Sequence, residues 1–338
     1  MIFLDNVTKQ FVTSKKYPGF IGAIKGLFTR EKVIKLAVNN ISMKINDGEV
    51  VGYIGGNGAG KSTTIKMMTG ILTPTSGTCM VNGINPAENR IENARNIGVV
   101  FGQRTQLWWD LPLSESFSIL KEIYHISSVD YESRMEYFNE VLGINEFINS
   151  SVRTLSLGQR MRADLAAALL HNPKVLYLDE PTIGLDVVVK ENIRRAIKEI
   201  NKKYNTTIIL TTHDMEDIEE LCNRIIIIDK GTVIYDGMLA DLMKTYGTKC
   251  IIEIEVKEVE LLQLNYNELL NISKENLSVK INKNNICFTF NKNAISVIDI
   301  ISYVMKRGTI KDFKVKETEL SEIVKEIYKK GMVGEVLC

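Results

Sequence analysis

The fold of this chain is decided by the stretch Gly55-Gly56-Asn57-Gly58-Ala59-Gly60-Lys61-Ser62. The stretch follows the apolar run 50–54 and precedes the helix-compatible residues 63–69. A strand, a glycine-rich turn and a helix form the setting in which the pattern G-x-x-x-x-G-K-[ST] binds phosphates. The glycines let backbone N–H groups face inward, and the helix contributes the positive end of its dipole. The sequence therefore predicts a site for a nucleoside triphosphate.

Side chains in and near this loop supply the predicted chemistry of the site. Lys61 would reach the terminal phosphates, and Ser62 would place its hydroxyl on a magnesium ion, which needs oxygen ligands. Thr63, the next residue, is included in the predicted nucleotide site. Phe11 ends the first expected strand and could stack on an adenine ring, because stacking needs only an apolar π-face. A core aromatic residue at the end of a strand explains Phe11 equally well.

The composition is that of a globular protein. The chain has 338 residues, of which 45% are hydrophobic and 25% are charged, and its formal net charge is +1. This length favours two domains, and the charge balance argues against a protein that coats nucleic acid. The five cysteines lack any C-x-x-C spacing, which predicts reduced thiols in a cytosolic protein, without a zinc site or a disulfide framework.

Neither the N-terminus nor the hydropathy pattern predicts a direct route to the membrane. Residues 1–5 lack the charged start and apolar core of a signal peptide. No uninterrupted apolar stretch approaches the length that spans a bilayer. We therefore expect any membrane role to come through a partner.

Alternating apolar strands and helices predict an α/β nucleotide-binding domain at residues 1–245. We expect three layers around a mostly parallel core sheet, with a β-rich N-terminal lobe and an inserted helical lobe at about residues 104–171. The strands expected at 2–11 and 37–45 form the β-rich lobe. Residues 246–338 predict a small α+β domain. Its role stays open between regulation, dimer contact and simple stabilisation.

A basic amphipathic segment interrupts the β-rich lobe at about residues 13–35. Its apolar side chains fall at helical spacing. Its charged residues are all basic except for a single acid, Glu31. Such a segment can lie on an anionic membrane surface or against a partner. The other interpretation is a surface insertion that packs its apolar face on its own lobe.

Two consecutive carboxylates indicate that the predicted phosphate site also hydrolyses its ligand. Asp179 and Glu180 follow the wholly apolar run 175–178, which is typical of a central strand of a parallel sheet. Asp179 could hold magnesium directly or through water. Glu180 would act as the general base that polarises the attacking water. At the ends of other strands, His213 is placed to contact the γ-phosphate, and Gln103 could complete the magnesium shell.

The order of these motifs resembles that of the ATPase subunits of ABC transporters. The resemblance covers about the first 240 residues and includes the following motifs: the phosphate loop 55–62, the Gln103 loop, the signature 155–160, the strand with its two carboxylates at 175–180, the loop Gly184-Leu185-Asp186, and His213. Two positions depart from the family pattern. Gly56 replaces the usual proline, and Leu157 replaces the first glycine of L-S-G-G-Q. Neither change removes a charged group, so hydrolysis of ATP with Mg²⁺ is still expected.

The resemblance also implies a P-loop ABC-type cassette that works as a head-to-tail dimer. In the family, the signature of one copy caps the γ-phosphate bound by the other, so Ser156, Gly158 and Gln159 would act in trans. Asp186 would belong to the same nucleotide site. One intact set of motifs in a single chain favours a homodimer.

The same resemblance implies a separate membrane permease with many helices. The segment from Val100 to Pro112, which holds both tryptophans, together with Arg160-Met161-Arg162, looks most like the exporter branch. The family meets its membrane subunit just after the Gln103 loop. The expected location is peripheral, on the cytoplasmic face of the cell membrane, with no nucleic-acid partner. Two alternatives stay open: a soluble ABC-type ATPase that acts on nucleic acid or ribosomes, and an importer ATPase with a regulatory C-terminal domain.

Overall fold

The computed structural model describes residues 1–14, 32–102, 104–257, 266, 273, 276–282 and 285–330. It contains two compact units, the first formed by Met1–Gly237 and the second beginning at Met238. Helix α9 (Leu239–Tyr246), most of which falls within the predicted first domain 1–245, belongs to the second unit, where it contacts α12 (Leu320–Lys330). None of the described helices combines the length and the hydropathy of a membrane span.

A six-stranded sheet forms the centre of the first unit. Its strands lie in the order β5 (Ile97–Phe101), β6 (Val175–Asp179), β7 (Thr207–Thr211), β3 (Val50–Gly55), β8 (Arg224–Asp229) and β9 (Thr232–Met238). The first five strands pair in parallel. Most of their apolar side chains are buried, as expected for strands that are covered on both faces. The predicted three-layer, mostly parallel α/β fold is confirmed.

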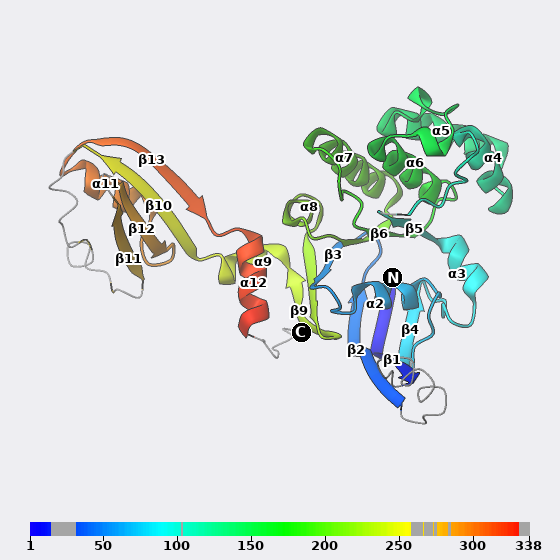
Figure 1. Cartoon of the computed structure of the whole chain (residues 1–338), viewed down its shortest axis with the longest axis horizontal. Helices are drawn as coiled ribbons and strands as arrows, with labels where there is room; N and C mark the ends of the chain where they lie inside the picture. Colours follow the sequence, from blue (N-terminus) through cyan, green and yellow to red (C-terminus); the bar gives the residue numbers. More distant parts are fainter. Residues whose placement is uncertain are drawn as a thin grey trace, which may run out of the picture. The chain divides into compact units, whose positions relative to one another are not determined.

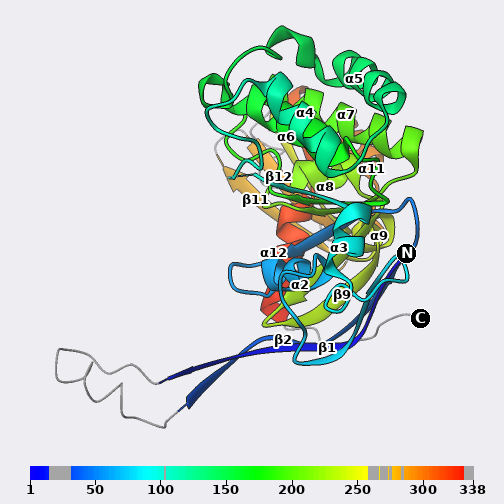
Figure 2. The same cartoon turned by 90° about the vertical axis from the view of Figure 1, so that its right-hand side faces the viewer.

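A second, antiparallel sheet forms the β-rich lobe, in the order β2 (Lys32–Ile45), β1 (Ile2–Ser14) and β4 (Ser76–Val81). Figures 1 and 2 show the central sheet between this lobe, which includes α2 (Lys61–Met68), and the helices α4 to α8. The apolar inner faces of both sheets and the side chains of α2 share one hydrophobic core. This packing fixes the phosphate loop between the two sheets.

Strands β1 and β2 are longer than the sequence predicts. Their pairing continues through Thr13↔Val33 and Ser14↔Lys32, so both ends of the predicted 13–35 segment belong to the β-ladder. The reason is backbone pairing, which does not require alternating side chains. Residues 15–31, with the apolar positions on which the amphipathic interpretation depends, lie outside the described residues.

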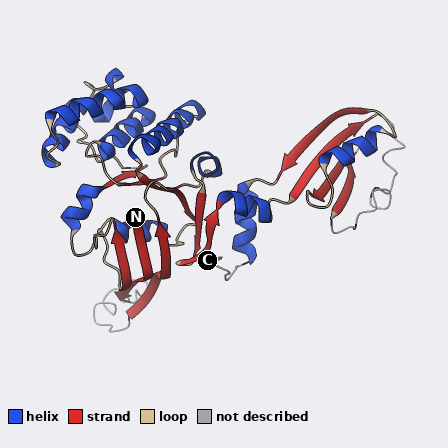
Figure 3. Ribbon diagram, turned by 180° about the vertical axis from the view of Figure 1, so that it is seen from behind, coloured by secondary structure: helices blue, strands red, loops and turns tan. Residues whose placement is uncertain are grey.

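The inserted lobe between β5 and β6 consists of helices, as predicted (Figure 3). It contains α4 (Leu113–Ile123), α5 (Ser128–Leu142), the short 3₁₀ turns η1 (Ile144–Glu146) and η2 (Val152–Thr154), and α6 (Leu157–Leu169). The ends of α5 follow capping rules, because the Ser127 side chain accepts the N–H of Asp130 and Gly143 takes a left-handed conformation (φ 60°). Among the described residues of this unit, the other helices are α3 (Arg90–Asn96), α7 (Val187–Tyr204) and α8 (Met215–Leu221).

The second unit has an α+β composition. An antiparallel sheet runs in the order β11 (Leu277–Asn282), β12 (Asn285–Asn291), β10 (Lys249–Val256) and β13 (Ile310–Glu317). Alternate side chains of β10 and β12 are buried, and they pack with α11 (Val297–Met305) in a separate hydrophobic core. This unit therefore buries apolar surface of its own.

Candidate functional site

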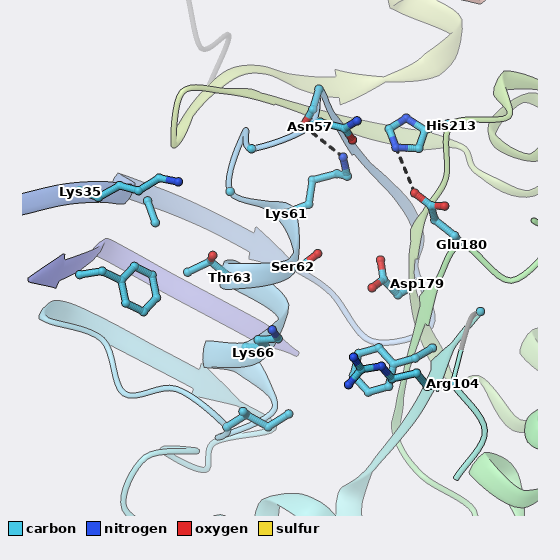
Figure 4. A pocket seen from close by; sticks show the side chains of 18 of the residues that line it. Lys35, Asn57, Lys61, Ser62, Thr63, Lys66, Arg104, Asp179, Glu180 and His213 are labelled. Atoms are coloured by element: carbon cyan, nitrogen blue, oxygen red, sulfur yellow. Dashed lines mark hydrogen bonds and ion pairs between the residues drawn. The ribbon is translucent and has the colours of Figure 1, made fainter. Parts of the chain in front are cut away.

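A cavity of about 770 Å³ lies between the phosphate loop and the carboxyl ends of the central strands (Figure 4). This volume is typical of a small-molecule site. Eleven of the residues predicted from the sequence line it: Phe11, Gly56, Asn57, Gly58, Gly60, Lys61, Ser62, Thr63, Asp179, Glu180 and His213. Gly55 and Ala59 belong to the same loop but do not line the cavity, and the side chain of Ala59 is buried. Gln103 lies outside the described residues.

The conformation of the phosphate loop requires two of its glycines. Gly58 and Gly60 have φ angles of 80° and 113°, in the left-handed region that side chains disfavour. A Cβ atom at Gly60 would lie 2.7 Å from the carbonyl oxygen of Ala37. At Gly56, where the family usually has proline, an added Cβ would meet nothing within 4 Å. A larger residue at position 56 would therefore meet no obstacle, so the close packing of the loop does not require glycine there.

Lys61 opens α2 and is held by the loop itself. Its ammonium donates to the carbonyl oxygens of Gly55 and Gly56. Burial lowers the pKa of Lys61, although the carboxylates of Glu180 and Asp179 oppose this shift by stabilising the charged form. An ammonium held at the loop carbonyls and lining the cavity is placed to form charge-assisted hydrogen bonds with the oxygens of an anion bound there.

Glu180 has an unusual backbone conformation. Its φ of 55° is in the left-handed region, and its N–H donates to the carbonyl oxygen of Thr211 at 2.8 Å. Gly102 is required beside it, because a Cβ there would lie 2.1 Å from the Glu180 carbonyl oxygen. The Glu180 carboxylate lies 3.0 Å from Nε2 of His213, and these side chains are 24% and 52% exposed. Both therefore remain accessible from the cavity.

The oxygen donors of the cavity fit Mg²⁺. The hydroxyl of Ser62 and the carboxylate of Asp179 both line the cavity, and Asp179 also accepts the Thr211 hydroxyl. Mg²⁺ keeps several waters and takes substrate phosphates, so it needs only one or two protein ligands of this kind. No group of three or more His, Cys, Asp or Glu that could hold a metal occurs among the described residues. Ser62 and Asp179 would hold the ion together with the nucleotide.

Three basic residues of the cavity wall are not among the predicted site residues. Lys35, Lys66 and Arg104 all line it. Lys66 follows Ser62 by one helical turn, so helix periodicity could have placed it there. Lys35 is the cross-strand partner of Phe11, and only the β1–β2 register reveals this proximity. The cavity therefore carries more positive charge than the phosphate loop alone supplies.

The signature residues do not line this cavity. Ser156 caps α6: its hydroxyl accepts the N–H of Gln159, and the Gln159 side chain accepts the N–H of Ser156 at 2.9 Å. Gly158 is packed closely, because an added Cβ would lie 2.8 Å from Val189. Asp186 caps α7 and likewise does not line the cavity. Within one chain, the signature and the phosphate loop are separate.

A second cavity, of about 340 Å³, lies between the signature helix and the loop after β5, and Asp164 lines it. The Asp164 carboxylate accepts the Thr105 hydroxyl at 2.7 Å and the Gln106 N–H at 3.2 Å. Burial raises the pKa of the Asp164 carboxyl to about 6, although these hydrogen bonds and Arg160 act in the opposite direction. At neutral pH this carboxyl group is therefore ionised in the folded protein, and its ionisation lowers the free energy of unfolding.

We expect Asp164→Asn to stabilise the protein at neutral pH. The folded protein binds the proton of Asp164 more tightly than the unfolded chain, so the stability contributed by this group falls as pH rises from 3.8 to about 6. At about 1.4 kcal/mol per tenfold change in the acid constant, asparagine would raise the free energy of unfolding above pH 6 by up to ~3 kcal/mol. Urea denaturation of both proteins at several pH values measures this difference. A gain that does not shrink as the pH is lowered through 6 would contradict the assignment, and Asp110→Asn, at an exposed position, is the control.

Comparisons with known proteins agree with this architecture. The family model "ABC transporter" matches residues 38–183. The chain is 34% identical over 216 residues to the ABC transporter ATP-binding protein NatA of Bacillus subtilis (strain 168), which covers 64% of this chain and 87% of that protein. It is 34% identical over 247 residues to the energy-coupling factor transporter ATP-binding protein EcfA2 of Clostridium perfringens (strain 13 / Type A), covering 71% and 87%.

A solved structure shares the fold. The ATP-binding cassette MJ0796, in a dimeric post-hydrolysis state bound to ADP and Pi, superimposes with a TM-score of 0.58 at 27% identity and covers 71% of this chain and 99% of that chain. The cassette fold expected from the sequence is thereby confirmed, as is ATP hydrolysis as its reaction. The chain belongs to the ATP-binding proteins of ABC transporters, the family of ATPases that power transport across membranes.

Proposed function

We propose that this chain is the motor subunit of an ABC exporter and that it hydrolyses Mg-ATP at the interface of a homodimer. One observation carries the proposal. The cavity brings Lys61, Glu180 and His213 together, whereas the signature residues lie elsewhere in the same chain. A second copy would supply Ser156, Gly158 and Gln159 to complete the site.

In the proposed mechanism, the phosphate loop and Lys61 bind the phosphates of ATP. The ion held by Ser62 and Asp179 would neutralise phosphate charge. Glu180 accepts the proton of the attacking water, because its carboxylate is accessible from the cavity and lies next to the phosphate site. His213 orients that carboxylate through the 3.0 Å contact and faces the charge that develops on the γ-phosphate.

The signature helix is suited to close the site from the other copy. Its N-terminus presents backbone N–H groups and a positive dipole end, which favour an anion such as the γ-phosphate. ATP would then hold two copies together, and its hydrolysis would release them. This cycle provides an open and a closed state that a permease can follow.

The surface after the Gln103 loop supports a separate permease as the partner. Trp108 and Trp109 are 39% and 48% exposed, so neither is buried in the helical lobe. The Arg160 guanidinium lies 5.4 Å from the centre of the Trp109 ring. Aromatic residues and arginine are enriched in protein interfaces. Binding there would place the ATPase on the cytoplasmic face of the membrane, and the exporter assignment rests on this segment.

The test is a pull-down of the tagged protein from detergent-solubilised native membranes in the presence of ATP. Recovery of a multi-span membrane protein by the wild type, with less recovery by a Trp108→Ala, Trp109→Ala variant, supports the permease. The ATPase and the recovered membrane protein would then be reconstituted together in vesicles. ATP-driven transport away from the side that carries the ATPase would establish an exporter, whereas transport toward that side would establish an importer. Recovery of ribosomes or nucleic acid without a membrane protein would overturn the transporter assignment.

A further inference from the structure

We propose that Asp217 is a positioning residue that holds the loops carrying Glu180 and His213 in one fixed arrangement, with Arg194 as its counter-ion. The inference rests on the catalytic roles proposed for Glu180 and His213. It adds a buried polar centre that lies outside the nucleotide cavity and acts on the reaction only through those two residues.

Asp217 lies in the first turn of α8 and is completely buried. A single carboxylate oxygen, Oδ2, accepts the hydroxyls of both Thr182 and Thr212, the second at 3.1 Å. Thr182 lies two residues after Glu180, and Thr212 immediately precedes His213. One oxygen atom therefore ties the loop after β6 to the loop after β7.

The hydrogen bonds to Asp217 lie next to a residue with a strained backbone conformation. Glu180 has a φ of 55°, and a non-glycine residue in the left-handed region persists only when its surroundings hold it there. The hydrogen bond from Glu180 N–H to Thr211 holds one side of the residue, and the Thr182 hydroxyl on Asp217 holds the other. The 3.0 Å contact between Glu180 and His213 is the result of both loops being fixed.

Arg194 of α7 compensates the buried charge. Its Nε donates to Oδ1 of Asp217 at 2.7 Å, and its Nη2 donates to Glu216 at 3.0 Å. Burial disfavours the charged guanidinium, but these two carboxylates more than compensate, and the pKa of Arg194 is raised. Arg194 thus donates to Oδ1, while both threonine hydroxyls donate to Oδ2.

A second hydrogen bond extends the centre toward His213. The Thr212 hydroxyl accepts the N–H of Asp214 at 2.9 Å while it donates to Asp217, and the Asp214 carboxylate accepts Lys190 at 2.6 Å. Hydrogen bonds in such chains polarise and strengthen one another. His213 lies between Thr212 and Asp214, so both of its neighbours in the chain are fixed.

A centre that served only stability would not need this chemistry. Replacing a buried polar network by apolar residues of similar volume is often neutral or stabilising. The two hydroxyls that Asp217 accepts belong to Thr182 and Thr212, which lie within two residues of Glu180 and His213, respectively. Positions of this kind govern the geometry of reacting groups, and their loss typically costs 10-fold to 100-fold in activity.

The test uses Thr182→Val and Thr212→Val, which remove one hydroxyl each and keep the side-chain shape. We expect each variant to lower kcat for ATP by about 10-fold to 100-fold, with KM and the affinity for ATP changed by no more than about threefold. The matched control is Thr207→Val, which also removes a buried, hydrogen-bonded hydroxyl but lies at the first residue of β7, the end of the strand opposite to Thr212 and His213. Its kcat should equal that of the wild type.

Two results would overturn the inference. One is a kcat like that of Thr207→Val in both variants. The other is a loss of kcat that is fully explained by a lower melting temperature, so that part of the variant is unfolded at the assay temperature. That result would show a role in stability alone. Failure of the proposed function looks different, because Glu180→Gln would then keep its turnover. If Glu180→Gln loses turnover and the threonine variants do not, only the positioning role is wrong.

Discussion

Glu180→Gln should lower the rate of ATP hydrolysis by about 10²-fold to 10⁴-fold, the range that a positioned general base contributes. Glutamine preserves the shape of the side chain and its contact distance to His213, but it cannot accept the proton of water. The phosphate loop and Lys61 are unchanged, so ATP binding should stay within about threefold of the wild type. Single-turnover hydrolysis and equilibrium binding of ATP measure the two quantities separately.

The same variant tests the proposed dimer. If hydrolysis opens the interface, ATP should accumulate Glu180→Gln as a dimer that sedimentation detects, while the wild type returns to monomers as ATP is consumed. The control is Glu219→Gln, which makes the same charge change at an exposed position of α8 and should leave turnover unaltered. Normal turnover by Glu180→Gln would disprove the assignment of the base.

The parts of the site that were predictable from the sequence are those whose chemistry is local. The phosphate loop needs glycines, a lysine and a serine at adjacent positions, and the carboxylate pair follows directly from its apolar strand. Because the carboxyl ends of parallel strands meet at one edge of the sheet, the same reasoning placed Asp179, Glu180 and His213 at one cavity. The parallel sheet itself was predictable because its strands are uniformly apolar.

The features that were missed depend on residues far apart in the chain. Lys35 reaches the cavity through its pairing with Phe11 across β1 and β2, and the sequence of neither strand states that register. Asp217 appears in the sequence as one acid among several in a short helix. Its contacts with Thr182, Arg194 and Thr212 arise only when α7, α8 and two loops pack together.

Lys61→Ala should weaken ATP binding by at least about 100-fold. The ammonium is positioned at the N-terminus of α2, among the backbone groups that would surround the phosphates. A hydrogen bond to a charged group contributes about 1.5–3 kcal/mol, and two such bonds to phosphate oxygens would give about 3 kcal/mol or more, where each 1.4 kcal/mol is about tenfold in affinity. Binding should be measured in the Glu180→Gln background, so that hydrolysis does not consume the ligand.

Lys66→Ala separates this specific role from the general effect of positive charge. Lys66 lines the same cavity five residues further along α2, and its removal changes the net charge by the same amount. Its side chain is exposed, whereas that of Lys61 is buried and anchored on the loop carbonyls. Exposed charges are screened by water and salt, so Lys66→Ala should weaken binding by less than about threefold. Equal losses in the two variants would mean that the cavity attracts ATP by overall charge, and the specific contact of Lys61 with the terminal phosphates would have to be abandoned.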